Sequence, residues 1–272
     1  MKMESKVILI TGSTDGIGKQ TAFELAKKGH TIIVHGREKQ KSQRIVKEIK
    51  SKIHGAIVES VSGDLSDFTQ IKNFCNDIKE YYSKLDVLIN NAGVFENNRV
   101  ILPNGFEKTF MINYLSHFFI TLQLLELLKE TPNSRIVNVS SMAQSGSIDF
   151  DNLNGEKYYD PYNAYAVSKL ENILFTYKLA RLLKNKQPIV NCLHPGVIKT
   201  KLLIAGWGMG GANLHTGAQE LVYSALSEDM NNKTGLYMVN QKPMRSATIS
   251  YDKKIQDRLW DISLTLTGLS YT

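Results

Sequence analysis

Cysteine is scarce in this chain, with only Cys75 and Cys192 among 272 residues. Both lie in apolar surroundings, without a Cys-x-x-Cys pair or a nearby histidine ligand pattern. This excludes a disulfide-stapled scaffold and indicates a reducing compartment with two thiols in the core. No His, Asp or Glu cluster has metal-ligand spacing, so no metal site is predicted.

Linkers, repeats and long apolar runs are also lacking. No Pro/Gly/Ser-rich tract or internal repeat divides the chain, which predicts one domain over residues 1–272. No apolar run approaches the roughly 20 residues that span a bilayer. Met1–Lys6 leads directly into the first apolar run, so no signal peptide or membrane anchor is expected, and a cytoplasmic location is predicted.

The charge is moderately basic, with 33 Lys and Arg against 26 Asp and Glu, a formal net charge of +7. The lysines are scattered and mostly alternate with Glu, Asp and Gln. This pattern favours a solvated surface over a nucleic-acid-binding one. A cofactor or substrate that bears phosphates would also suit a basic surface.

Short apolar runs, mostly rich in Val and Ile, alternate with helical patterns along the chain. The predicted strands are Val7–Ile10, Thr31–Val34, Ala56–Val61, Leu85–Ile89, Arg135–Val139, Ile189–Leu193 and Leu236–Val239. The predicted helices are Lys19–Lys28, Glu38–Lys52, Asp67–Tyr82, Glu107–Lys129 and Ala164–Leu183. This alternation predicts an α/β fold with a doubly wound, mostly parallel sheet of about seven strands, flanked by helices, with ligands at the carboxyl ends of the strands.

A glycine-rich turn follows the first predicted strand and opens a helix, with the spacing G-x-x-x-G-x-G. Glycines let the backbone approach a pyrophosphate, whose charge is favoured at a helix N-terminus. The predicted contacts are Gly12, Ser13, Thr14, Asp15, Gly16, Ile17 and Gly18. The turn therefore predicts a dinucleotide cofactor.

The end of the second predicted strand reads His35-Gly36-Arg37, without the Asp or Glu that usually holds the ribose hydroxyls of NAD. Arg37 can pair with a 2′-phosphate through its planar fork, which favours NADP(H) over NAD(H). Lys41, one turn into the next helix, is a second candidate. The alternative is that Arg37 only caps the sheet edge.

Tyr165 and Lys169 lie one turn apart on one face of a predicted helix. An ammonium near a phenol favours the phenolate and brings proton transfer toward neutral pH. Ser141, after an apolar strand, adds a third polar group. Without it and the glycine turn, the same spacing would equally describe a surface tyrosine beside a surface lysine.

The least regular stretch is 202–215, which holds Gly206, Gly208, Gly210 and Gly211 around Trp207 and Met209. Glycines beside apolar residues are typical of a substrate lid. The alternative is a poorly ordered surface loop.

The chain resembles the short-chain dehydrogenase/reductase family over nearly its full length, because several motifs of that family occur in the family's order. They are Thr11-Gly12 to Gly18, Asp64-Leu65, Asn90-Asn91-Ala92-Gly93, Asn113, Val139-Ser140-Ser141, Tyr165 to Lys169, and His194-Pro195-Gly196 followed by Thr200. Gly105-Phe106-Glu107, Asn113 to Phe118, Ser168 to Leu174 and Leu259-Trp260 to Leu269 resemble its retinol-dehydrogenase-like and WW-domain-oxidoreductase-like branch. A WW domain is absent from the sequence.

The resemblance implies a Rossmann fold and an NADP(H)-dependent interconversion of an aldehyde or ketone with an alcohol. It assigns Tyr165 as the general acid or base, Lys169 as its activator and ribose partner, and Ser141 rather than Ser140 as the hydrogen-bond donor to the carbonyl oxygen. It implies that Asn113 organises a water molecule that relays protons to Lys169. It also implies cofactor contacts at Asp64, Leu65, Asn91, Ala92, Gly93, Pro195, Gly196, Val197 and Thr200.

The aromatic and methionine content near the predicted lid indicates an apolar substrate. The family often forms homodimers or homotetramers through two long helices, here Glu107–Lys129 and Ala164–Leu183. The rival hypothesis is a dinucleotide-sensing or scaffold protein that keeps the fold without useful catalysis. The complete set of Ser141, Tyr165 and Lys169 argues against that rival.

Overall fold

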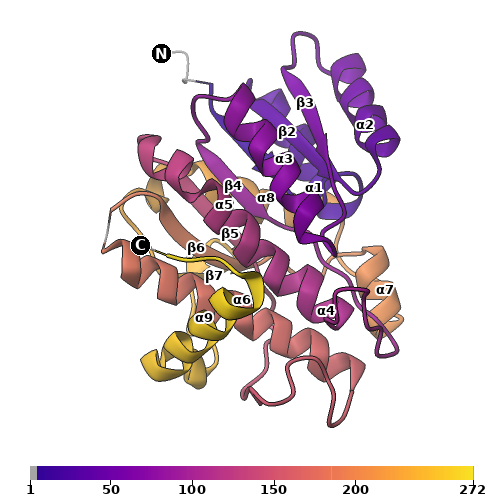
Figure 1. Cartoon of the computed structure of the whole chain (residues 1–272). Helices are drawn as coiled ribbons and strands as arrows, with labels where there is room; N and C mark the ends of the chain where they lie inside the picture. The colour runs from indigo at the N-terminus through magenta and orange to yellow at the C-terminus, as the bar shows by residue number, and fades with distance from the viewer. Residues whose placement is uncertain (1–4, 185, 272) are drawn as a thin grey trace.

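The computed structural model describes residues 5–184 and 186–271, and its centre is one eight-stranded sheet (Figure 1). Met1 to Glu4, part of the segment in which no anchor was expected, lie outside the described residues. The strand order is β3-β2-β1-β4-β5-β6-β7-β8, and only the last pair is antiparallel. The predicted doubly wound sheet is confirmed, with one strand more than the seven expected.

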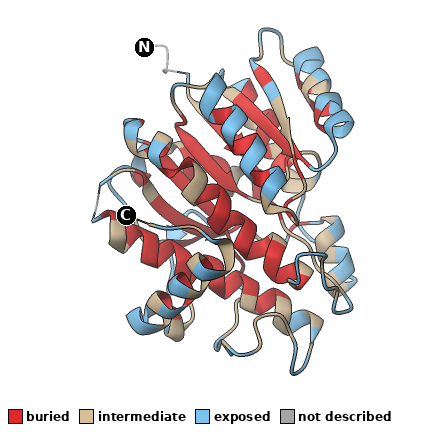
Figure 2. Ribbon diagram, viewed as in Figure 1, coloured by how far each residue is buried: buried red, intermediate tan, exposed pale blue. Residues whose placement is uncertain are grey.

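The strands agree closely with the apolar runs. They are β1 Val7–Ile10, β2 Thr31–Gly36, β3 Val58–Ser62, β4 Val87–Asn90, β5 Arg135–Val139, β6 Ile189–His194, β7 Tyr237–Val239 and β8 Lys242–Pro243. The central strands are buried along their length, because helices cover both faces (Figure 2). The missed strand β8 has two exposed residues and pairs only with β7, so it has no apolar run to reveal it.

The helices form one apolar core on each face of the sheet. On one face lie α1 Gly16–Lys27, α2 Lys39–Lys52 and α8 Leu214–Leu226. On the other lie α3 Phe68–Tyr81, α4 Lys108–Phe110, η1 Met111–Leu115, α5 Ser116–Glu130 and α6 Pro161–Leu183, with α9 Lys253–Thr267 packed outside α6. The remaining short helices are α7 Lys201–Trp207, η2 Glu228–Met230 and η3 Thr248–Tyr251.

The span Lys108–Glu130, which joins α4, η1 and α5, is long and apolar enough to cross a membrane. It has 23 residues and a mean hydropathy of 1.3 in its most apolar window, so the prediction that no run approaches this length is wrong by that measure. That window is 72% buried inside the fold, as in the core helix of a soluble protein. The segment is apolar because it packs against the sheet, α3 and α6.

Helix α9 packs along α6, and its side chains also reach α5 and η1. The Trp260 ring lies 5.2 Å from that of Phe118 and 6.1 Å from that of Phe175. Ser263 Oγ lies 2.6 Å from Tyr114 Oη. The chain's own C-terminal helix therefore occupies part of the outer surface of α6 and contacts the adjoining α5.

The strand order reverses between β1 and β4, which are neighbours in the sheet although β2 and β3 separate them in sequence. A crevice opens at the carboxyl ends of strands at such a switch point. The glycine turn follows β1, Asn91 follows β4 and Ser141 follows β5. Parallel topology thus brings three distant motifs to one edge.

Candidate active site

A pocket of about 880 Å³ occupies this edge of the sheet. Of the predicted residues it is lined by Gly12, Thr14, Asp15, Gly16, Ile17, Gly18, Arg37, Asp64, Leu65, Asn91, Ala92, Gly93, Ser141, Tyr165, Lys169, Pro195, Gly196, Val197 and Thr200. Ser13 and Asn113 do not line it. The fold therefore gathers nearly all of the predicted site in one cavity.

The glycine turn is shaped by contacts that exclude larger side chains. Gly12 has φ of +63°, and a Cβ there would lie 2.8 Å from the Cα of Ala92. A Cβ on Gly18 would lie 2.4 Å from Asn91 Nδ2. Asn91 Nδ2 donates to the carbonyl of Thr11 at 2.9 Å and that of Gly12 at 3.3 Å, so this amide braces the turn.

Ser13 lies behind the turn and is fully buried. Its hydroxyl donates to the Ile10 carbonyl at 2.8 Å and accepts from the His35 amide at 2.9 Å. The side chain predicted to contact the cofactor instead ties the turn to β1 and β2.

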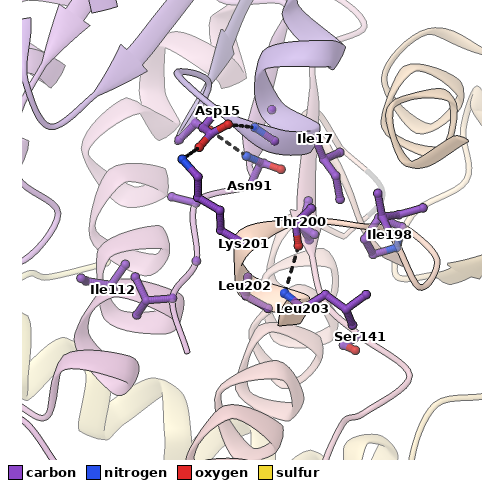
Figure 3. Close-up of a pocket in the computed structure, with 18 of the residues that line it drawn as sticks. Asp15, Ile17, Asn91, Ile112, Ser141, Ile198, Thr200, Lys201, Leu202 and Leu203 are labelled. Carbon is purple, nitrogen blue, oxygen red and sulfur yellow. Dashed lines mark hydrogen bonds and ion pairs between the residues drawn. The ribbon is translucent and has the colours of Figure 1, made fainter. Parts of the chain in front are cut away.

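Asp15 caps α1, with Oδ1 accepting from the Gly16 amide at 2.8 Å. Lys201 Nζ lies 2.5 Å from Asp15 Oδ2, and its hydrogen bond holds the pKa of Asp15 below the ordinary value (Figure 3). This exposed ion pair joins the glycine turn of residues 12–18, which we call the phosphate turn, to the first residue of α7.

The structure distinguishes the two serines after β5. Ser140 Oγ donates to the Lys169 carbonyl at 2.7 Å and is 2% exposed, so it anchors α6. Ser141 Oγ accepts from the Ala143 amide at 3.0 Å and hydrogen-bonds Tyr165. Both serines line the pocket, but only Ser141 pairs with the phenol.

Tyr165 and Lys169 lie together on α6, with Lys169 Nζ 5.3 Å from the centroid of the Tyr165 ring. Burial raises the pKa of Tyr165 to about 12, and the Ser141 hydrogen bond opposes this rise. The net fall in the Tyr165 pKa that was expected beside Lys169 is not found, because desolvation of the phenolate dominates. Burial also lowers the pKa of Lys169 to about 8. Its ammonium donates to the Val139 carbonyl at 3.2 Å.

Asn113 lies in η1, a π-helical turn that interrupts the predicted continuous helix. Its side chain accepts from the Val94 amide at 2.8 Å and donates to the Val94 carbonyl at 3.0 Å and to Ser168 Oγ at 3.1 Å. A Cβ on Gly93 would lie 3.5 Å from Asn113 Oδ1 and 3.7 Å from Lys169 Nζ. Asn113 is thus buried directly behind the pocket wall, near Lys169.

Charged side chains that follow β2 and β3, and one in the first turn of α2, line the end of the pocket away from Tyr165. Arg37 and Lys41 both approach Glu38 Oε1, at 3.8 and 3.7 Å, and all three side chains are more than half exposed. Asp64 Oδ1 accepts from the amide and the hydroxyl of Ser66 at 2.9 and 2.8 Å. Glu38 was not among the predicted site residues.

The predicted lid region contains a regular helix, α7, rather than an irregular loop. Thr200 Oγ1 accepts from the Leu203 amide at 3.1 Å and caps the helix, which ends at Gly208 with φ of +62° (Figure 3). No residue of α7 is buried. Because glycines are frequent in this stretch, the sequence did not predict the short capped helix.

An aromatic cluster beside Tyr165 extends the site beyond the predicted residues. The Trp207 ring lies 5.4 Å from those of Tyr165 and Phe95 and 5.9 Å from that of Tyr162. A Cβ on Gly206 would lie 3.0 Å from the Phe95 ring, so glycine permits this packing. Phe95 stands two residues after Gly93, but no pattern in the sequence pairs it with Trp207.

Among residues 5–184 and 186–271, no group of three or more His, Cys, Asp or Glu side chains could hold a metal ion. The pocket instead fits a dinucleotide. A glycine turn at a helix N-terminus, where a Cβ at Gly12 or Gly18 would collide with its neighbours, suits a pyrophosphate.

Comparisons with known proteins identify the family. The short chain dehydrogenase family model matches residues 6–206. Human (Homo sapiens) retinol dehydrogenase 11 is 37% identical, covering 99% of this chain and 88% of its own length. Human polyprenol dehydrogenase is 35% identical, covering 97% and 86%. The crystal structure of an uncharacterized protein from Mycobacterium Paratuberculosis superposes with a TM-score of 0.82 at 29% identity, covering 98% and 95%. The chain therefore belongs to the short-chain dehydrogenase family, in its retinol-dehydrogenase-like branch, and is an oxidoreductase that acts on CH–OH groups with a nicotinamide dinucleotide.

Proposed function

We propose that this enzyme interconverts an apolar aldehyde or ketone with its alcohol and uses NADP(H) in preference to NAD(H). One observation carries the proposal. Ser141, Tyr165 and Lys169 converge at one end of a pocket whose other end holds the basic side chains of Arg37 and Lys41.

The catalytic roles follow from the positions of three side chains. A bound nicotinamide dinucleotide supplies or takes up the hydride. Tyr165 Oη donates its proton to the carbonyl oxygen in reduction and accepts the hydroxyl proton in oxidation. Ser141 Oγ–H donates a hydrogen bond to the same oxygen as negative charge develops there. Lys169, with a pKa near 8, is mostly cationic at neutral pH and favours the phenolate that reduction leaves behind.

At neutral pH Tyr165 is in the protonated form that reduction requires. A phenol with a pKa of about 12 is protonated at neutral pH, and this is the form that donates a proton to a carbonyl oxygen. Asn113 would act as a positioning residue, since its amide holds both polar groups of the Val94 backbone beside Gly93. Its predicted water relay to Lys169 stays a prediction.

The preference for NADP(H) is supported by positive charge after the end of β2 and in the first turn of α2. Arg37 and Lys41 give this rim two cations, and Glu38 lies between them. A 2′-phosphate offers these cations a doubly charged acceptor, whereas the ribose hydroxyl of NAD does not.

An apolar substrate is supported by the surroundings of Tyr165. Phe95, Tyr162 and Trp207 lie around one side of it, and the exposed side chains of Met142 and Met209 also line the pocket or its edge. We propose that α7 is the lid. The exposed surface of α7, its ion pair to Asp15 and the contact of Trp207 with Tyr165 support this proposal.

We also propose that the chain does not dimerise through α5 and α6, because α9 packs on part of the surface of α6 that such a dimer would use. The predicted cytoplasmic location and the absence of nucleic-acid partners stay predictions.

The function is tested by NADPH consumption across a panel of apolar and polar aldehydes and ketones. Tyr165→Phe should keep NADPH affinity, because the ring contacts with Trp207 and Phe95 remain, and should lower kcat by about 10²- to 10⁴-fold. The control is Tyr162→Phe, the same chemical change one turn earlier on an exposed side chain. Full activity of Tyr165→Phe would refute the mechanism. NADPH binding without turnover of any compound in the panel would support the sensing or scaffold hypothesis instead.

A further inference from the structure

His35, the second-to-last residue of β2, links two parts of the cofactor pocket. The side chain lines the pocket but is only 2% exposed. Its Nδ1 lies 3.2 Å from the Gly12 amide nitrogen, and its Nε2 lies 3.1 Å from the Gly63 carbonyl oxygen. Gly12 belongs to the phosphate turn, and Gly63 lies between β3 and Asp64. One imidazole therefore connects the phosphate turn to the segment that leads to Asp64.

The two contacts require a single tautomer. Burial lowers the pKa of His35 to about 4, so the ring is neutral at physiological pH and carries one N–H. A carbonyl oxygen only accepts, so Nε2 must carry the hydrogen and donate to Gly63. Nδ1 then keeps the lone pair that accepts from the Gly12 amide.

The ring and the backbone of His35 are both held in place. The ring centroid lies 4.8 Å from that of Phe74. The His35 amide donates to Ser13 Oγ at 2.9 Å, and the Ser13 amide donates to the His35 carbonyl at 2.9 Å. The side chain therefore presents Nδ1 to Gly12 from a fixed position.

Gly12 is constrained from two directions. Its left-handed backbone packs against Ala92, and Asn91 Nδ2 donates to its carbonyl. These contacts come from the segment after β4. His35 supplies the constraint from β2, on the opposite side of β1 in the sheet.

We propose that His35 is a positioning residue for the dinucleotide. It holds the phosphate turn at a set distance from the β3 end before the cofactor arrives, so less ordering free energy is lost on binding. This inference rests on the proposed cofactor site. It assigns to His35 a contribution to cofactor affinity and none to the chemical step.

The test compares three substitutions at His35 with one at a matched histidine. His35→Phe keeps a ring beside Phe74 but removes both nitrogens. His35→Asn places an amide oxygen near the position of Nδ1 and can still accept from Gly12, whereas His35→Gln reaches only toward Gly63. The control is His30→Phe. His30 directly precedes the first residue of β2, at the other end of the strand from His35. It is 3% exposed, and its Nδ1 accepts from the Lys6 amide at 3.3 Å.

NADPH affinity is measured by fluorescence titration, and kcat at saturating NADPH. His35→Phe should weaken NADPH binding by up to about tenfold, because the turn that is no longer held in place loses ordering free energy when the cofactor binds. Its kcat at saturation should stay near that of the parent. His35→Asn should recover most of the affinity, His35→Gln less, and His30→Phe should bind NADPH as the parent does.

Unchanged NADPH affinity in His35→Phe, or an equal loss in His30→Phe, would overturn the inference. If His35→Phe does not fold, the ¹⁵N shifts of His35 in the parent decide, because an Nδ1–H tautomer would contradict the proposed pair of contacts. A parent that fails to bind NADPH would instead refute the proposed function, before any variant is compared.

Discussion

Replacing the buried Lys169 by methionine should stabilise the protein at pH 7 while removing its activity. The Lys169 side chain is 3% exposed, and its ammonium donates to the Val139 carbonyl. Desolvation by burial is the cause of its lowered pKa. Folding at neutral pH therefore places a cation where water no longer solvates it.

The magnitude follows from the pKa of Lys169. A fall from 10.5 to about 8 corresponds to roughly 3 kcal/mol of free energy spent on keeping the buried amine charged. Methionine has a similar length, so little cavity is expected, and the lost hydrogen bond to Val139 costs about 1 kcal/mol. Lys169→Met should therefore raise the free energy of unfolding by about 2 kcal/mol at pH 7.

The advantage of Lys169→Met should depend on pH. Between pH 8 and pH 10.5 the unfolded parent holds a proton on Lys169 that the folded parent lacks. The stability contribution of the parent residue therefore rises with pH through this window. The difference between variant and parent should be full below pH 8 and shrink above it.

The assay is urea unfolding followed by circular dichroism at pH 7 and at about pH 9.5. Lys178→Met is the control, because Lys178 lies on the same helix but its ammonium is 2.7 Å from Asp257 Oδ1. Its removal should lower stability. The reasoning is refuted if Lys169→Met is less stable than the parent at pH 7, or if its advantage is unchanged at the higher pH.

Two further substitutions test the cofactor preference and the covered helix face. Arg37→Ala should reduce the preference for NADPH over NADH by about ten- to a hundredfold in competitive titrations. Arg44 is an exposed arginine of α2 outside the pocket, and Arg44→Ala should leave this preference unchanged. Equal affinities of the parent for NADPH and NADH would contradict the assignment. Trp260→Ala should lower the free energy of unfolding by about 3–5 kcal/mol and promote self-association in sedimentation experiments, because it uncovers Phe118 and Phe175. Trp207→Ala, on a helix without buried residues, should lower stability less than Trp260→Ala and should not promote self-association. A dimeric parent built on α5 and α6 would disprove the proposed role of α9.

The fold was readable from the sequence because its signals are local. Apolar runs of four to six residues recover β1, β2, β5 and β6 within two residues at each end. Such runs are continuous because both faces of a parallel sheet are buried. One strand and three α-helices were not predicted: the edge strand β8 and the helices α7, α8 and α9. The two exposed residues of β8 and the glycine-rich stretch around α7 give no periodic signal.

The catalytic motif was equally local, but the partners of each side chain were not. Tyr165 and Lys169 share a helix face by spacing alone. That Ser13 faces away from the pocket, and that Ser140 anchors α6 while Ser141 pairs with Tyr165, follows from hydrogen bonds between segments far apart in sequence.

The sequence by itself determined the order of the seven predicted strands and five predicted helices, the glycine turn and the placement of a phenol beside an amine, because each depends on neighbouring residues. Tertiary structure alone decided the protonation of those groups, since desolvation depends on everything packed around them. It raised the pKa of Tyr165 where the motif predicted a fall. It also placed α9 over the long helices and His35 between two ends of the cofactor pocket, because such contacts exist only once the sheet has assembled.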